Sequence, residues 1–135
     1  MSLIGTPFAR PDARAKVTGA ARYPADLVRA GMLHCKAVFA DRAHARIDRV
    51  DTVRALAVPG VVAVLTAKDV PHNRFGLIDD DQEVLCSERV RYTGDRVALV
   101  VAESAAVAAA AAELVEVEFE DLPIVGDALL SLIHI

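Results

Sequence analysis

Apolar residues fall on every second position in two stretches, one near each end of the chain. The first runs from Met32 to Phe39, and the second runs from Val115 to Glu120, where apolar residues alternate with glutamate. A period of two is typical of a β-strand with one buried and one exposed face. We therefore predict two half-exposed strands, and the side chains expected to face inward from the first are Leu33, Cys35, Ala37 and Phe39.

Two other stretches are apolar without alternation, VVAVL at 61–65 and VALVVA at 97–102. A short continuous run of aliphatic residues is typical of a strand that is covered on both faces. We predict buried strands at both places. A more polar strand is expected over 45–50, extended chain over 84–92 and a turn at 93–95.

Capping residues predict where helices begin. Asp51 or Thr52 can accept an exposed backbone N–H at the start of a helix that reaches Ala57, and Pro59-Gly60 then ends it. The segment 66–69 fits a capping box and predicts a helical turn.

The longest predicted helix follows the second buried strand. Ser104 can cap it, and its alanine-rich sequence extends to Leu114. Val107, Ala111 and Leu114 lie at i, i+4 and i+7 and are expected to face the sheet.

Strand, helix and strand follow one another twice, over residues 32–65 and 97–119. The helix and last strand of the second unit have similar lengths, so this crossover can return the chain parallel to the first strand. The connection between the two units holds a polar loop at 71–82 and further extended segments. The order of elements predicts an α+β fold, with a mixed sheet and helices packed mainly on one side, rather than a doubly wound parallel sheet.

The amino-acid composition and charge of the chain exclude several classes of function. The chain has 135 residues, the size of one domain, and 54% of them are hydrophobic while only 4% are aromatic. A formal net charge of −4 argues against a nucleic-acid binder. No apolar run reaches the roughly 20 residues of a membrane span, and the first residues lack the pattern of a secretory signal. Cys35 and Cys86 are expected as buried thiols of a cytoplasmic protein.

Residues that could perform chemistry are present, but their spacing does not assemble a site. The sequence contains neither a Gly-rich phosphate loop nor a nucleophile elbow. The three acids at 79–81 lack the spaced ligands of a hard-cation loop and are interpreted as a solvated acidic loop. The candidate metal ligands, of which the first two are adjacent on a strand and point to opposite faces, are His34, Cys35, His44, His72 and Cys86.

Three further features have a structural and a functional interpretation, and the structural one is favoured in each case. His44 either hydrogen-bonds the backbone in a turn or contacts a partner, and Tyr92 either packs at a strand end or makes such a contact. Glu116, Glu118 and Glu120 share one strand face and form a solubilising edge more simply than an acid–base pair. We therefore predict no catalytic, cofactor-binding or metal-ligating residue in this chain.

Six blocks follow one another in the order and spacing of one protein family. They are Lys16–Ala20 with Tyr23 and Asp26, Ala43–Ile47, Asp51-Thr52, Val58–Pro71, Val90–Glu103 and Val115–Pro123. Together they resemble the N-terminal α/β-hammerhead domain of the molybdenum hydroxylases. These are the molybdopterin-binding large subunits of the xanthine dehydrogenase, aldehyde oxidase and carbon monoxide dehydrogenase family.

The resemblance implies an α/β-hammerhead fold and a place in a larger oxidoreductase. In the family, the domain precedes a longer region that holds the molybdopterin-type molybdenum cofactor and a glutamate base. That region hydroxylates a C–H carbon of an aldehyde, purine or other heteroaromatic with water as the oxygen source. Electrons then pass to an iron–sulfur (2Fe-2S) subunit and an FAD subunit.

None of the family's cofactor-binding or catalytic residues falls on residues 1–135. The resemblance therefore implies a structural and interface domain that binds no cofactor, is inactive by itself and packs against the remainder of the molybdenum subunit. No nucleic-acid or membrane partner is expected. The alternative is a free-standing protein-interaction module with no enzymatic activity.

The expected organisation has three parts. Residues 1–15 form an extended N-terminal arm, 16–123 form the hammerhead domain, and 124–135 match nothing in the family. The last part ends in ALLSLIHI and is expected to be a truncated or out-of-frame tail.

Overall fold

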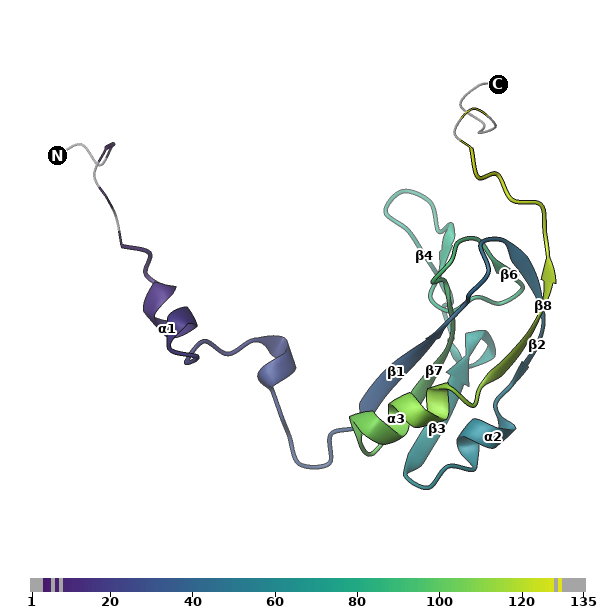
Figure 1. Cartoon of the computed structure of the whole chain (residues 1–135), viewed down its shortest axis with the longest axis horizontal. Coiled ribbons are helices and arrows are strands. Elements are labelled where there is room, and N and C mark those ends of the chain that lie inside the picture. The colour runs from purple at the N-terminus through teal and green to yellow at the C-terminus, as the bar shows by residue number, and fades with distance from the viewer. Residues whose placement is uncertain (1–3, 6, 8, 128, 130–135) are drawn as a thin grey trace. The chain divides into compact units, whose positions relative to one another are not determined.

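The computed structural model describes residues 4, 5, 7, 9–127 and 129, so most of the predicted tail lies outside the described residues (Figure 1). The chain divides into two compact units, Met1–Met32 and Leu33–Ile135. The first unit contains helix α1, Ala13–Val17, and the 3-10 turn η1, Pro24–Asp26. Helix α1 begins inside the segment predicted to be extended. An ion pair of 2.6 Å between Asp12 and Lys16, four residues apart, is the local signal that favours it.

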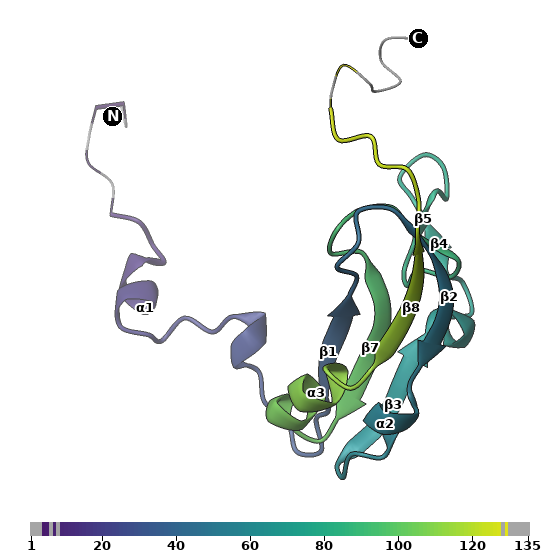
Figure 2. The same cartoon turned by 45° about the vertical axis from the view of Figure 1, so that its right-hand side comes forward.

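The described residues of the second unit form antiparallel strands, the short helices α2 and α3 and the 3-10 turn η2 (Figures 1 and 2). Its elements are β1 (His34–Phe39), β2 (Ala45–Asp51), α2 (Val53–Leu56), β3 (Val61–Thr66), η2 (Ala67–Asp69), β4 (Arg74–Phe75), β5 (Gln82–Glu83), β6 (Arg89–Val90), β7 (Arg96–Ala102), α3 (Ala105–Ala112) and β8 (Glu116–Asp121).

The described strands form three sheets, with the orders β1-β7-β3, β6-β2-β8 and β4-β5. Strand β7 lies in the middle of the first sheet, which confirms a strand over 97–102. Val97, Ala98, Val100 and Ala102 are buried, but Leu99 and Val101 are only half-buried, so the predicted cover is complete on one face only. Strand β3 is different. It lies at an edge of the same sheet, none of its residues is buried, and the predicted cover on both of its faces is wrong.

The helices explain why only one face of the first sheet is covered. Helix α3 packs on β1 and β7, and α2 packs on β3, so both lie over the same face (Figure 2). Ser104 Oγ accepts the backbone N–H of Val107 at 3.3 Å, which confirms the predicted cap. Ala108 and Ala111 are the buried residues of the helix, and their small side chains let it approach the sheet closely.

Strand β8 joins a different sheet from the strand before α3. It pairs antiparallel with β2, and the parallel return predicted for this crossover is wrong. The reason is that both edges of β7 are already occupied, by β1 and by β3. All described pairings are antiparallel. The α+β class with helices mainly on one side is confirmed.

The predicted orientation of β1 is also wrong. Leu33 and Phe39 are 42% and 56% exposed, and Cys35 is exposed as well. The residue of β1 that packs against the helix-side core is Val38, and Ala40 is buried just beyond the strand. The alternating apolar residues therefore point away from the helices, because the helices lie on the other face of the sheet.

Two predicted turns are confirmed by their hydrogen bonds and dihedral angles. Asp51 Oδ1 accepts the backbone N–H of Val53, the first residue of α2, at 3.0 Å, whereas the side chain of the N-cap residue Thr52 makes no such bond. Gly60 follows with a φ of +89°, which a glycine adopts without strain. Gly94 has a φ of +91° in the turn before β7. The capping box between Thr66 and Asp69 begins η2 as predicted.

The segment predicted as a polar loop at 71–82 contains a short hairpin. Strands β4 and β5 pair antiparallel, and Asn73 continues the ladder with its side chain, which donates to Leu85 O at 2.7 Å and accepts from Leu85 N at 3.0 Å. The tip of the hairpin exposes Leu77 and Ile78 fully. A two-residue strand is too short to leave a periodic signal, so the sequence pattern does not predict it.

Candidate functional site

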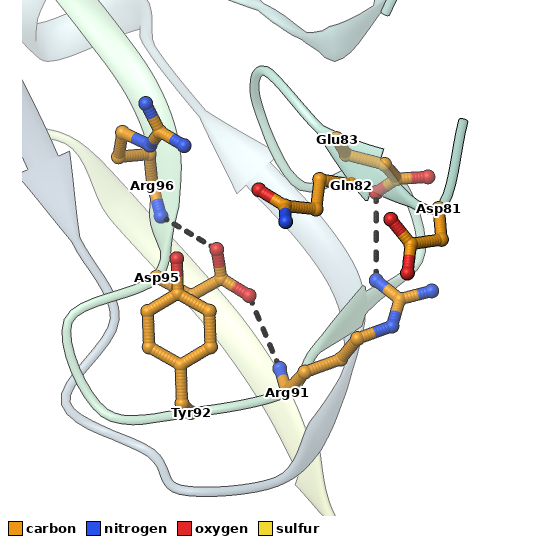
Figure 3. Close-up of a pocket in the computed structure, with 7 residues that line it drawn as sticks. All are labelled: Asp81, Gln82, Glu83, Arg91, Tyr92, Asp95 and Arg96. Carbon is orange, nitrogen blue, oxygen red and sulfur yellow. Dashed lines mark hydrogen bonds and ion pairs between the residues drawn. The ribbon is translucent and has the colours of Figure 1, made fainter. Parts of the chain in front are cut away.

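A small pocket of about 80 Å³ lies beside the turn between β6 and β7 (Figure 3). Asp95 is its buried carboxylate, only 6% exposed. It accepts hydrogen bonds from the backbone N–H groups of Arg91 at 3.2 Å and Arg96 at 3.0 Å. The residues that line the pocket are Asp81, Gln82, Glu83, Arg91, Tyr92, Asp95 and Arg96.

The backbone of the same turn is tied to the end of β1. Ala40 N–H donates to Asp95 O, and Gly94 N–H donates to Ala40 O, both at 2.8 Å. Asp95 therefore fixes the turn from both its side chain and its main chain. The sequence pattern predicts a turn at Thr93-Gly94-Asp95 but not this role of the Asp95 carboxylate, which accepts N–H groups on both sides of the turn.

The second carboxylate of the pocket belongs to Glu83 on β5. It accepts from the backbone N–H of Ser87 at 2.9 Å and from Ser87 Oγ at 2.7 Å, and it lies 3.9 Å from the Arg91 guanidinium (Figure 3). The carboxylates of Asp95 and Glu83 are thus bound to groups of the protein itself, and Asp81 is a third carboxylate in the lining. The arrangement holds β5, β6 and β7 together.

The two cysteines have opposite environments. Cys86 is buried next to this pocket, and burial raises the pKa of its thiol to about 12, with further contributions from a hydrogen bond and the charge of Asp95. A thiol with such a pKa stays protonated and unreactive at neutral pH. Cys35 is exposed on β1. The prediction of two buried thiols is therefore confirmed for Cys86 and wrong for Cys35.

The candidate metal ligands are not brought together. Among the residues that the structure describes, no group of three or more histidine, cysteine, aspartate or glutamate side chains could hold a metal ion. His44 Nδ1 hydrogen-bonds Pro123 O at 2.8 Å, and the backbone N–H of Leu122 donates to His44 O at 3.0 Å. The structural interpretation of His44 is confirmed, because its side chain ties the start of β2 to the chain that follows β8.

The three glutamates of β8 face solvent and pair with arginines. Glu118 lies 3.9 Å from Arg49 on β2, and the other two pairs are Glu116 with Arg54 and Glu120 with Arg46. We call this surface of β2 and β8, with Arg46, Arg49, Glu116, Glu118 and Glu120, the charged face. The predicted solubilising edge is confirmed, and arginine partners on β2 and α2 balance its charge.

Two pockets, one around Asp95 and one beside β2, do not fit a molybdenum cofactor. The pocket around Asp95 is far smaller than the roughly 300–1,000 Å³ of ligand sites, and its Asp95 and Glu83 carboxylates are bound to groups of the chain itself. A second crevice of about 270 Å³, between β2 and η2, contains the solvent-facing side chains of Arg49 and Lys68. Neither offers the buried, unpaired polar groups that would hold such a group.

Comparison with known proteins gives a consistent result. A family model for "Aldehyde oxidase and xanthine dehydrogenase, a/b hammerhead domain" matches residues 18–123. A probable xanthine dehydrogenase subunit of Bacillus subtilis (strain 168) is 49% identical over 116 residues, covering 85% of this chain and 16% of that protein. The xanthine dehydrogenase molybdenum-binding subunit of Escherichia coli O157:H7 is 39% identical over 127 residues, covering 86% and 17%.

Solved structures have the same fold. The aldehyde oxidoreductase from Desulfovibrio desulfuricans matches with a TM-score of 0.87 and 39% identity, over 93% of this chain and 15% of that chain. This chain therefore spans about a sixth of the length of these relatives. No helix in the described part of the chain is long and apolar enough to cross a membrane. The resemblance drawn from the six sequence blocks is confirmed, and the chain belongs to the a/b hammerhead domain family of aldehyde oxidases and xanthine dehydrogenases.

Proposed function

We propose that this chain serves as the N-terminal structural and interface domain of the large subunit of a molybdenum hydroxylase. The observation that supports this most directly is the match of residues 18–123 to the hammerhead domain, because that segment includes every strand of the second unit. The remainder of the subunit would hold the molybdenum cofactor. It would hydroxylate a C–H carbon of an aldehyde, purine or other heteroaromatic, with water as the oxygen source.

The proposed division of labour agrees with the arrangement of polar groups. Asp95, Glu83 and His44 are each bound to backbone or side-chain groups of the same chain, so they serve the architecture. In this proposal the domain binds no cofactor itself and works with an iron–sulfur (2Fe-2S) subunit and an FAD subunit in the cytoplasm. The alternative, a free-standing interaction module, is not favoured, since the relatives are subunits of oxidoreductases or whole ones.

A chimeric enzyme tests the proposal. Residues 18–123 would replace the matched segment of the Desulfovibrio desulfuricans aldehyde oxidoreductase, and molybdenum content and aldehyde oxidation would be measured. We expect both to stay within a few fold of the parent enzyme. A matched chimera with Val100→Asp, which places a charge in the core, should lose both. A chimera that folds but contains no molybdenum would contradict the proposal.

A titration tests the other half of the proposal. This chain would be titrated anaerobically with molybdopterin cofactor and followed by absorbance and by equilibrium dialysis. We expect no stoichiometric binding. Tight binding at one equivalent would show that the domain is itself a cofactor site, and the structural role would have to be abandoned.

A further inference from the structure

One face of the β1-β7-β3 sheet is apolar and has no described cover. Cross-strand partners point to the same side of a sheet, and Cys35 is paired with Val101, which is paired with Ala63. Ala37, Leu99 and Leu65 form the next row in the same way. We call this surface the open face, and its residues are Leu33, Cys35, Ala37, Phe39, Ala63, Leu65, Leu99 and Val101.

The opposite face of the sheet is the one that packs on the helices. Ala98 and Val100 are buried there against Ala55, Ala111 and Val115. By contrast, none of the eight residues of the open face is buried, and Leu33, Cys35 and Phe39 are exposed. The first charged residue along the open face is Arg96, opposite Phe39 at one end.

An apolar face of this kind is typical of a surface that is buried in the intact protein. The alternation of apolar residues along β1 predicts that Leu33, Cys35, Ala37 and Phe39 face inward, yet they point away from the helices. Sequence and structure agree if another part of the protein covers the face. Large exposed apolar patches are rare on monomeric proteins, and they mark interfaces.

We propose that the open face is the surface on which the remainder of the large subunit packs. This inference rests on the proposed function, and the length of the relatives indicates what occupies the face. More than four fifths of the length of each relative lies outside the match, so a large mass of polypeptide has to dock on this domain. A face that is apolar except for one charged residue at its end is typical of a permanent, core-like interface and not of an exchangeable subunit contact.

Cys35 provides a native reporter for the cover. It is exposed on the open face, whereas Cys86 is buried and its thiol stays protonated, so the two thiols give a signal and an internal reference. The rate of N-ethylmaleimide modification of the Cys35 peptide would be measured by mass spectrometry in the native state. The samples are this 135-residue chain, the longer large subunit alone, and the subunit assembled with its iron–sulfur and flavin partners.

We expect Cys35 to react rapidly in the 135-residue chain and at least tenfold more slowly in the large subunit alone, with full reactivity after denaturation. Equal rates in the first two samples would overturn the proposal. Slow reaction already in the 135-residue chain would overturn it too, because residues 1–32 or a second copy would then be the cover. Protection that arises only after the other subunits bind would assign the face to a different occupant and contradict it.

A pair of variants distinguishes loss of docking on the open face from loss of folding. Leu99→Asp places a charge on the open face and should raise the modification rate of Cys35 in the large subunit several fold. Glu118→Gln on the charged face should leave the rate unchanged. Both variants of the 135-residue chain should keep its circular dichroism spectrum. A Leu99→Asp large subunit in which Cys35 stays as protected as in the parent would contradict the proposal.

The outcomes distinguish this inference from the proposed function. A large subunit that contains molybdenum and oxidises substrate, but whose Cys35 is reactive, would overturn the open face as the docking surface only. A large subunit that protects Cys35 but contains no molybdenum would overturn the proposed function only.

Discussion

The charged face and the open face are both outer surfaces of antiparallel sheets in one small unit, yet their chemistry is opposite. On the charged face, Glu118 and its neighbours pair with arginines of β2 and α2 while Val117 and Phe119 pack inward. On the open face, the rows that contain Cys35, Val101 and Leu99 are apolar. Alternation along a strand indicates which residues are buried in the intact protein. The chemistry of the outward residues indicates whether water is their final environment.

The largest effects are expected when a charged residue is introduced on one or the other face of β7. Val100→Asp puts a carboxylate into the buried cluster and should cost at least about 3–5 kcal/mol of the free energy of unfolding. Leu99→Asp, one residue earlier on the open face, should cost about 1 kcal/mol or less, mainly through β-propensity. Urea unfolding of the 135-residue chain, followed by circular dichroism, measures both.

The control for this pair is Val100→Ala, which removes volume without adding charge and should fall between the two. Equal losses for Val100→Asp and Leu99→Asp would mean that the open face is already buried in this chain. The contrast between the two sides of the sheet would then be wrong.

The stability of the chain at alkaline pH should depend on the buried Cys86 and not on Cys35 of the open face. The pKa of Cys86 is raised from 9.0 to about 12 by burial and by Asp95. Below pH 9 the thiol is protonated in both folded and unfolded chains, so it has no effect on stability. Between pH 9 and 12 only the unfolded chain loses the proton, and stability should fall by about 1.4 kcal/mol per pH unit.

The measurement is urea unfolding at pH 8, 9 and 10 for the parent chain and for Cys86→Ala and Cys35→Ala. The slope should be shallower only in Cys86→Ala, since lysine and tyrosine titrations are common to all three chains. Parallel slopes for the parent and Cys86→Ala would contradict the raised pKa.

Local signals in the sequence are sufficient to predict most elements of the fold. Ser104, the Thr66–Asp69 capping box and the Gly94 turn each act over three or four residues, so their effect does not depend on the rest of the chain. The pairing of β8 with β2 cannot be predicted in this way. It depends on both edges of β7 being occupied, which is a property of the whole sheet.

Local sequence signals also predict only part of what the site residues do. The sequence favours a backbone hydrogen bond for His44, and one is made, but its acceptor is Pro123 O, which is 79 residues distant along the chain. The sequence indicates Asp95 only as part of a turn, and its burial depends on β1 and β5, which are distant along the chain. The predicted orientation of Cys35 is wrong for a different reason. Alternation distinguishes the two faces of a strand, but it does not indicate which of them the helices cover.

Removal of the α3 cap is expected to have a smaller effect than Val100→Asp or the alkaline titration of Cys86. Ser104→Ala deletes the acceptor for Val107 N–H at the start of the helix and should cost about 1 kcal/mol. Ser104→Asp keeps an acceptor and should cost less. Because α3 covers the opposite side of the sheet, the reactivity of Cys35 in the folded chain should stay unchanged in both variants. A large change in that reactivity would show that the two faces are coupled.

The smallest effect is expected on the charged face. Arg49 and Glu118 lie 3.9 Å apart with both side chains mostly exposed, and Arg49 also pairs with Asp51 at 2.6 Å. A double-mutant cycle with Arg49→Ala and Glu118→Ala should give a coupling of about 0.2–1 kcal/mol at low salt. In 1 M NaCl the coupling should approach zero, because screening then acts within about 3 Å. A large coupling that does not respond to salt would place these charges in a protected interface. In that case the charged face, like the open face, would need a partner, and the difference in outward chemistry would no longer distinguish the two.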